Sequence, residues 1–315
     1  MTQVLALSGS IGGAKLALGL QLVLPPGELT VAVNTGDDFE HLGLAISPDL
    51  DTMLYTLAGL SNPELGWGRA GESWNFMAEI ERLGGESWFR LGDKDLAVHI
   101  ERTRRLDAGE KLSGITADFA RHLGLLGKVV PMTDDLVRSM VITDEGTLDF
   151  QHYFVARRCE PAVHGLAYAG AADAQLLPVI QETLQDPSLR AIVICPSNPW
   201  LSIAPLLEIP AWREALHEAA APVIAVSPLV NGQAVKGPTS KIMSELQLEL
   251  SSPAIARFYE GLIDGFVLDK SEAQLAPEIG VATHVTGTLM KTAADKQRLA
   301  REVLEFAQSF RNVAF

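Results

Sequence analysis

The stretch VLALSGSIGGAK, residues 4–15, decides how this chain folds. Val4 to Leu7 is a short apolar run, typical of a buried strand, and a glycine turn follows it. The pattern then predicts a helix from Gly12 to Leu24, which Pro25-Pro26-Gly27 ends, and a second apolar strand from Leu29 to Val33. This order is one βαβ unit, in which the loops after both strands face the same crevice.

The second half of the chain returns to alternating strands and helices. Short apolar runs predict further strands at 129–132, 166–169, 191–195, 223–226, 265–268 and 284–286. A long helix from Thr292 to Phe310 closes the chain, and Arg138 to Thr143 and Thr147 to Val155 form a predicted β-hairpin around Asp144-Glu145-Gly146. We therefore predict an α/β, Rossmann-like fold, with a mostly parallel sheet, helices on both faces and a small β-hairpin.

A helical region interrupts this alternation. Asp51 or Thr52 is placed to cap a helix that continues through Leu57, and the pattern predicts further helices at 74–83, 93–106 and 115–123. We therefore predict a single α/β domain, residues 1–315, with a helical insertion of about residues 51–126 that covers the crevice.

The composition excludes several classes of protein. With 315 residues, 47 % hydrophobic and 20 % charged, the chain has a globular balance. The net charge of −14 argues against a nucleic-acid partner, which usually selects a basic face. No apolar run approaches the ~20 residues of a membrane span, the N-terminus lacks the basic region of a signal peptide, and Cys159 and Cys195 show no metal spacing. We expect a cytoplasmic protein without a membrane partner.

The glycine turn is suited to an anion. Gly12 and Gly13 let the backbone approach a ligand where the helix begins, and the free amides of that helix end favour a phosphate. The turn is not a G-x-G-x-x-G fingerprint, because Ile11 occupies the second glycine position, nor a P-loop, because Leu16 follows Lys15. Lys15 either contacts phosphate or is a solvated lysine, and an ordinary tight turn is the alternative for the whole segment.

Two acidic loops follow the βαβ unit, at Asn34 to Asp38 and at Ser47 to Thr52. Clustered carboxylates repel a phosphate unless a cation lies between them, so the loops indicate a divalent metal, with Asp37, Asp49 and Asp51 as candidate ligands. For Asp51, capping a helix is an equal alternative.

A dinucleotide fold places an acidic residue close to the second strand end, where it holds a ribose. Here that position carries Asn34 and Thr35, so a metal or hydroxyl contact fits better than a ribose. For Asp38 the more ordinary interpretation is an Asx turn around Gly36.

Three later segments carry further polar candidates. Asp93 opens a predicted helix on which Asp95 and His99 share a face, so they can bind a substrate hydroxyl. Alternatively, Asp93 caps that helix and His99 packs against the sheet. Ser197 and Asn198 lie between two prolines after an apolar strand. Ser227 follows the next strand directly. Ser197, Asn198 and Ser227 therefore either line the crevice or cap helices.

The motifs together resemble the CofD family, the 2-phospho-L-lactate transferases of deazaflavin coenzyme synthesis. The resemblance spans essentially the whole chain and rests on segments in a fixed order: Gly9 to Lys15, Asn34 to Asp38, Ser47 to Thr52, Leu91 to His99, Pro196 to Pro199 and Ser227 to Gly232. Its most specific parts are the run Pro48 to Thr52 and the sequence Pro196-Ser197-Asn198-Pro199.

The resemblance implies a Mg²⁺-dependent transferase of coenzyme F(420) biosynthesis. A GDP-linked three-carbon acid would be the donor, and the terminal hydroxyl of the deazaflavin Fo would attack its phosphorus and release GMP. The acid is 2-phospho-L-lactate, phosphoenolpyruvate or 3-phosphoglycerate, and the motifs do not choose among them. The family also implies a homodimer.

The resemblance also implies roles for individual residues. Asp37, Asp49 and Asp51 would hold Mg²⁺, or one of them would accept the proton of the attacking hydroxyl. The remaining candidates would contact phosphate, nucleotide or Fo: Gly12, Gly13, Lys15, Asn34, Thr35, Asp93, His99, Ser197, Asn198 and Ser227.

Two other functions remain open at the level of sequence. A non-catalytic UDP-sugar-binding regulator of the gluconeogenesis-factor type shares the Gly-Gly turn and a loop like Pro196 to Pro199. An NAD-dependent oxidoreductase fits less well, because the second glycine and the acidic residue at the second strand end are missing.

Overall fold

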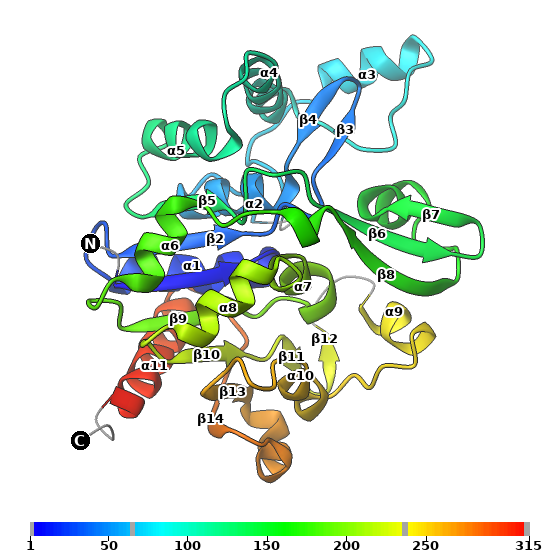
Figure 1. The fold of residues 1–315 in the computed structure, drawn as a ribbon. Coiled ribbons are helices and arrows are strands. Elements are labelled where there is room, and N and C mark those ends of the chain that lie inside the picture. Colours follow the sequence, from blue (N-terminus) through cyan, green and yellow to red (C-terminus); the bar gives the residue numbers. More distant parts are fainter. Residues whose placement is uncertain (1–2, 64–66, 235–238, 312–315) are drawn as a thin grey trace.

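A parallel sheet of seven strands forms the centre of the molecule in the computed structural model, which describes residues 3–63, 67–234 and 239–311. Every neighbouring pair of strands is parallel, and the order is β14-β13-β10-β9-β1-β2-β5 (Figure 1). The strands are β1 (Val4–Ser8), β2 (Leu29–Val33), β5 (Lys128–Pro131), β9 (Ala191–Ile194), β10 (Val223–Val226), β13 (Gly265–Asp269) and β14 (Ala282–Thr286).

The strand order locates the crevice. From β1 the chain builds outward through β2 to β5, and then it returns to the other side of β1 and builds outward from β9 to β14. The order therefore reverses between β1 and β9, and a ligand crevice in such a sheet lies outside the carboxyl ends of the strands at this point. The predicted α/β, Rossmann-like fold is confirmed.

Both faces of the sheet are covered because its strands are apolar on both sides. In β1, Leu5 and Leu7 face one core while Val4 and Ala6 face the other. The first core is closed by α6 (Pro178–Gln185), α7 (Ala204–Leu207), α8 (Pro210–Glu218) and α10 (Ser252–Phe258). The second is closed by α1 (Ile11–Val23), α2 (Pro48–Leu57), α5 (Leu112–His122) and α11 (Ala293–Arg311).

The region predicted as a helical insertion divides into two parts. Its first helix, α2, packs Leu50 and Leu54 into the main core beside α1. The prediction that Asp51 or Thr52 caps this helix is wrong, because the helix already begins at Pro48. Proline has the backbone angle of a first helical residue and no amide hydrogen to satisfy, so it starts the helix earlier.

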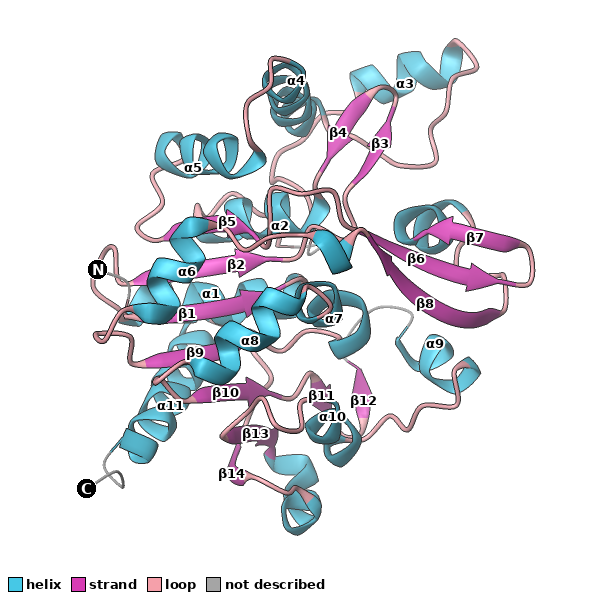
Figure 2. Cartoon of the chain, viewed as in Figure 1, coloured by secondary structure: helices cyan, strands magenta, loops and turns pink. Residues whose placement is uncertain are grey.

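The second part leaves the sheet. Helices α3 (Asn75–Arg82) and α4 (Asp93–Asp107) lie beside a two-stranded hairpin, β3 (Phe39–His41) and β4 (Leu44–Ile46), around a small apolar cluster (Figure 2). We call these four elements the hairpin lobe. The hairpin was not predicted; it turns at Leu42 and Gly43, which both have positive φ, as a tight two-residue hairpin requires.

A three-stranded antiparallel sheet stands beside the main one, in the order β7-β6-β8 (Figure 1). The predicted hairpin is confirmed at β6 (Arg138–Thr143) and β7 (Gly146–Asp149). The second arm was predicted too long, because His152–Ala156 is a π-helical turn. We expected 166–169 to continue the α/β alternation; instead it lies in β8 (Val163–Ala169), which pairs antiparallel with β6. β8 is mostly half-buried, which suits an antiparallel sheet with a solvated face.

The remaining elements are short: β11 (Leu229–Val230), β12 (Gln233–Ala234), α9 (Thr239–Glu245), and helical turns at Ala171–Asp173, Pro199–Ile203 and Lys270–Glu278. Among the described helices, none combines the length and apolar character that a bilayer crossing needs.

Candidate functional site

Three loops meet at the carboxyl end of the sheet, where the strand order reverses. The glycine turn follows β1, Asn34 to Asp38 follow β2, and the loop that begins at Cys195 follows β9. A Cβ added at Gly12 would lie 2.5 Å from the carbonyl oxygen of Pro196, and one added at Gly9 would lie 2.6 Å from Cβ of Asn34. Glycine is therefore required here because neighbouring loops touch its backbone.

The first turn of α1 begins at this junction, so its free backbone amides lie beside the three loops. Ser10 caps the helix: its Oγ accepts from the amide of Gly13 at 3.3 Å and donates to Oγ of Ser197 at 3.2 Å. The first turn carries no acidic side chain that would compete with an anion. Lys15 lies half-buried in the next turn. The structure thus brings Gly12, Gly13 and Ser197 together.

Two carboxylates converge beside the glycine turn, and Asn34 links their loops. Its Nδ2 donates to Oδ2 of Asp49 at 3.0 Å, and its Oδ1 accepts from the amide of Gly36 at 2.8 Å. Burial, and then the charge of Asp49, raise the pKa of Asp37 well above its usual range. Burial raises the pKa of Asp49 to about 7. Both shifts indicate carboxylates that are short of positive charge.

This pair fits a divalent cation. Oδ1 of Asp37 is buried and accepts no hydrogen bond from the described part of the chain. A buried carboxylate oxygen without a donor is costly unless a cation occupies its open side. Carboxylate oxygens are also the ligands that Mg²⁺ prefers. Asp37 and Asp49 therefore suit Mg²⁺ on observations independent of the sequence motifs.

The β3–β4 hairpin explains why the two acidic loops meet. It begins directly after Asp38 and ends directly before Ser47, and Oγ of Ser47 donates to Oδ2 of Asp38 at 2.7 Å. Burial raises the pKa of Asp38 to about 7 despite this hydrogen bond. The Asx turn around Gly36 belongs to Asn34 rather than to Asp38. Thr35 is buried in the same turn.

Asp51 points into a different environment. Both of its oxygens accept from the guanidinium of Arg102, Oδ2 at 3.1 Å from Nη1 and Oδ1 from Nη2. His99 lies between two acids, with Nδ1 3.6 Å from Asp51 and Nε2 3.3 Å from Asp95. Tyr55 donates to Asp95. We call Asp51, Tyr55, Asp95, His99 and Arg102 the Arg102 network.

The Arg102 network already holds its own cation. Asp51, Asp95 and His99 lie close enough together to bind a metal ion, but the guanidinium beside Asp51 would repel one. Of the three predicted metal ligands, the structure therefore brings together Asp37 and Asp49 and gives Asp51 an arginine partner. Sequence reasoning missed Arg102, although its spacing of three residues from His99 on one helix was a usable signal.

Asp93 joins α4 to α3 within the hairpin lobe. Its carboxylate accepts from Oγ of Ser73 at 2.6 Å and from the amides of Asn75 at 3.2 Å and Phe76 at 3.1 Å, so it caps α3 rather than its own helix. The hydroxyl of Ser73, followed by these amides, lowers the pKa of Asp93 to about 2. Glu72 makes the reciprocal contact, because its carboxylate accepts from the amides of Lys94 and Asp95 in the first turn of α4.

Two of the remaining candidates have local structural partners. Oδ1 of Asn198 accepts from the amides of Trp200 at 2.9 Å and Leu201 at 3.0 Å, which is a helix cap. Oγ of Ser227 lies 2.9 Å from Oγ of Ser252. Ser227 follows β10, which is two strands away from β1 and its glycine turn. Ser197 is the residue of this group that the structure brings to the glycine turn.

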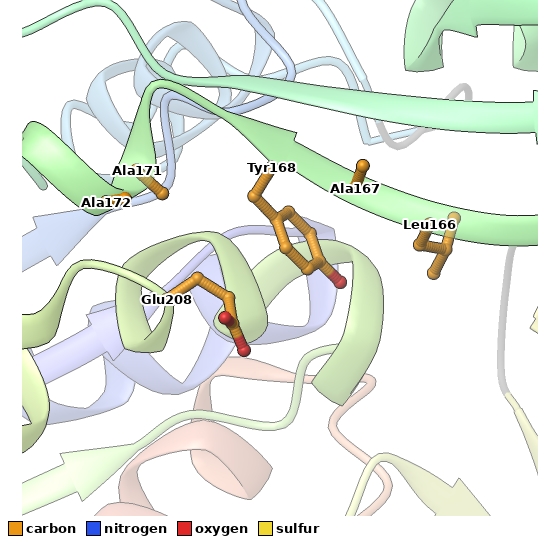
Figure 3. A pocket seen from close by; sticks show the side chains of 6 residues that line it. All are labelled: Leu166, Ala167, Tyr168, Ala171, Ala172 and Glu208. Atoms are coloured by element: carbon orange, nitrogen blue, oxygen red, sulfur yellow. The ribbon is translucent and has the colours of Figure 1, made fainter.

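A separate hollow lies between β8 and the end of α7 (Figure 3). Its lining consists of Leu166, Ala167, Tyr168, Ala171, Ala172 and Glu208. The hydroxyl of Tyr168 already donates to the carbonyl of Trp200, and burial raises its pKa. The hollow offers one carboxylate and no glycine turn, so it is not the candidate site.

Comparison with known proteins decides the family. The family model described as 2-phospho-L-lactate transferase CofD matches residues 4–308. This chain belongs to the CofD family. The resemblance inferred from the sequence motifs is thereby confirmed.

Two CofD relatives illustrate the two names that similar proteins carry. A 2-phospho-L-lactate transferase from Methanopyrus kandleri is 40 % identical over 308 residues, covering 96 % of each chain. A phosphoenolpyruvate transferase from Streptomyces griseus subsp. griseus is 36 % identical over 318 residues, covering 98 % of this chain and 99 % of the relative. These names support the prediction of an enzyme that is a transferase.

A solved structure supports the fold. A crystal structure of a upf0052 family protein from Bacillus halodurans superposes on this CofD chain with a TM-score of 0.60, covering 96 % of this chain and 99 % of the other. The two sequences are only 14 % identical, so this likeness concerns the fold alone.

Proposed function

We propose that this CofD protein transfers a phosphorylated three-carbon acid from a GDP-linked donor to the terminal hydroxyl of Fo, with release of GMP, in coenzyme F(420) biosynthesis. Family membership supports the transferase class. The observation that carries the proposal at the residue level is the acidic pair Asp37 and Asp49 beside the glycine turn. A diphosphate enters an acidic crevice of this kind together with a divalent cation.

Each part of the site has a task in such a transfer. Phosphoryl transfer depends on in-line placement and on neutralising oxygen charge more than on covalent help. The amides at the start of α1, around Gly12, hold a phosphate of the donor, and Ser197 closes the cradle from the β9 side. Held by Asp37 and Asp49, Mg²⁺ would supply neutralising charge to the diphosphate oxygens.

The chemistry of the step is balanced without a further reactant. The oxygen of the Fo hydroxyl forms a bond to the phosphorus that bears the acid, and the bond from that phosphorus to the bridging oxygen breaks. GMP leaves with the bridging oxygen, and the hydroxyl proton passes to a carboxylate, Asp37 or Asp49. The product is a phosphodiester between Fo and the acid.

Three acids are candidates for the group that is transferred. The relatives are named for phosphoenolpyruvate and for 2-phospho-L-lactate, and 3-phosphoglycerate is the third possibility. Purified protein is incubated with Fo, Mg²⁺ and each GDP-linked acid, and the products are identified by mass spectrometry. We expect a phosphodiester and an equal amount of GMP from at least one donor. Absence of both products with all three donors contradicts the proposal.

The same preparation distinguishes a regulatory protein from an enzyme. Calorimetric titration with UDP-sugars and with GDP compares the two nucleotide classes. Tight binding of a UDP-sugar together with no product from Fo would favour the non-catalytic regulator.

We further propose that the protein works as a homodimer in the cytoplasm. The mass of the protein in solution, measured by light scattering, tests whether it is a dimer.

A further inference from the structure

Arg102 is among the largest fully buried side chains of the molecule, with 1 % of its surface exposed. A buried guanidinium is costly unless its charge is paired and most of its hydrogen-bond donors are satisfied. Nη1 and Nη2 of Arg102 find acceptors, while Nε finds none among the described residues. Besides its two contacts with Asp51, Nη1 of Arg102 donates to the carbonyl oxygen of Ala45 at 3.3 Å. The next residue of α4, Thr103, accepts from the amide of Ala45 at 2.8 Å through its hydroxyl oxygen.

These contacts hold both sides of one acidic loop. Ala45 belongs to β4, which leads into the loop, and Asp51 belongs to α2, which leaves it. Asp49 lies between them, two residues before Asp51 in the first turn of α2. One side chain of α4 therefore fixes the segment that carries half of the acidic pair.

We propose that Arg102 is a positioning residue for the metal site, which keeps Asp49 facing Asp37 before a cation binds. The inference rests on the proposed function, because it assumes that this pair binds the metal. From the β2 side, Nδ2 of Asn34 donates to Oδ2 of Asp49 at 3.0 Å. From the α4 side, the guanidinium holds Asp51, and with it the first turn of α2, so that the site is preorganised before a cation arrives.

The alternative role for Asp51 makes an opposite prediction. If Asp51 were itself a metal ligand, Arg102 would compete with the metal for its oxygens. Removing the guanidinium would then free Asp51 and tighten metal binding. If Arg102 positions the site, removing its fork weakens metal binding instead.

The test uses the full-length protein and Mn²⁺ as a spectroscopic substitute for Mg²⁺. Arg102→Lys keeps the charge and loses the planar fork that holds Asp51 with two hydrogen bonds. We expect the Kd for Mn²⁺, measured by electron paramagnetic resonance without substrates, to rise about tenfold or more. Unchanged or tighter binding by the folded variant overturns the positioning role.

A matched control lies on the same helix. Arg105 is nearly buried and holds Glu110 and Asp118, neither of which belongs to α2 or to β4. Arg105→Lys should therefore lower the melting temperature without changing the affinity for Mn²⁺. Loss of Mn²⁺ affinity in this control would show that general destabilisation explains the effect, which overturns the proposal.

If Arg102→Lys does not fold, a second variant tests the same contact. Asp51→Asn keeps the side-chain volume but weakens the pair from the other side, and we expect a similar loss of Mn²⁺ affinity; an unchanged Kd overturns the proposal. If the unaltered protein binds no Mn²⁺, the proposed metal site itself fails. If the unaltered protein binds Mn²⁺ and both variants bind it with the same Kd, only the positioning role fails.

Discussion

Asp49→Asn is expected to lower the transfer rate by about three orders of magnitude while making the metal-free protein more stable. Removing one of two metal ligands forfeits charge neutralisation of several kcal/mol, and about 4 kcal/mol corresponds to a factor of about 10³ in rate. The amide oxygen of the new side chain can still accept from Asn34, as the carboxylate does now at 3.0 Å. The local hydrogen bond is therefore preserved while the negative charge is lost.

The gain in stability has the same origin. In the metal-free protein, burial disfavours the charge of both Asp37 and Asp49, and the charge of Asp49 adds to this at Asp37. Relief of about 1 kcal/mol would raise the melting temperature of a chain of this size by about 2 °C. The measurements are initial rates of product formation at saturating Mg²⁺, and thermal unfolding in the presence of a chelator.

A neighbouring acid provides the control for this prediction. Glu40 lies exposed on β3, between the two acidic loops in the sequence, and is not part of the candidate site. Glu40→Gln should change neither the rate nor the melting temperature appreciably. An Asp49→Asn variant with near-normal activity, or one that melts at a clearly lower temperature than the metal-free parent, would contradict the account.

Gly12→Ala carries the second large expected effect. Its new Cβ would lie 2.5 Å from the carbonyl oxygen of Pro196, closer than such atoms approach in proteins. The obstacle is backbone, so either the glycine turn or the β9 loop must move. We expect a loss of about 1–3 kcal/mol in the free energy of unfolding. We also expect at least a tenfold loss of affinity for GDP with Mg²⁺, because the amide cradle is displaced.

Gly114→Ala is the matched control for the same chemical change. Gly114 lies inside α5, and a Cβ added there would meet nothing within 4 Å. Alanine should therefore raise the free energy of unfolding by about 0.5 kcal/mol, because it loses less backbone entropy on folding and Gly114 lies in the first turn of the helix. Chemical unfolding and calorimetry with GDP measure both variants. Parent-like GDP affinity in Gly12→Ala would show that the cradle does not depend on this contact.

The sheet was predictable because its strands are continuous apolar runs punctuated by glycine and proline. The predicted runs at 29–33 and 223–226 coincide with β2 and β10. The parallel pairing of β1 with β2 is that of the predicted βαβ unit. The β3–β4 hairpin was not predictable in the same way. Its strands have three residues each, and its turn uses Leu42 at positive φ, where asparagine or glycine is the usual signal.

The candidate site was predictable only in its local parts. The alternation of strands and helices implies that parallel strands share one carboxyl edge, whereas the position of β9 next to β1 became visible only in the structure. The partner of Asp51 was not implied, because Arg102 lies 51 residues away and is brought to it by the packing of α4 on β4. For the same reason the interhelical capping role of Asp93 became visible only in the folded chain.

The proposed function depends on a divalent cation between Asp37 and Asp49, which lets a diphosphate enter a crevice of a chain whose net charge is −14. Calorimetric titration of the unaltered protein with GDP, in Mg²⁺ and then in excess chelator, tests it most directly. We predict saturable binding in Mg²⁺ and at least a hundredfold weaker binding in chelator, which corresponds to about 2.7 kcal/mol. Equal affinity under both conditions would contradict the claim.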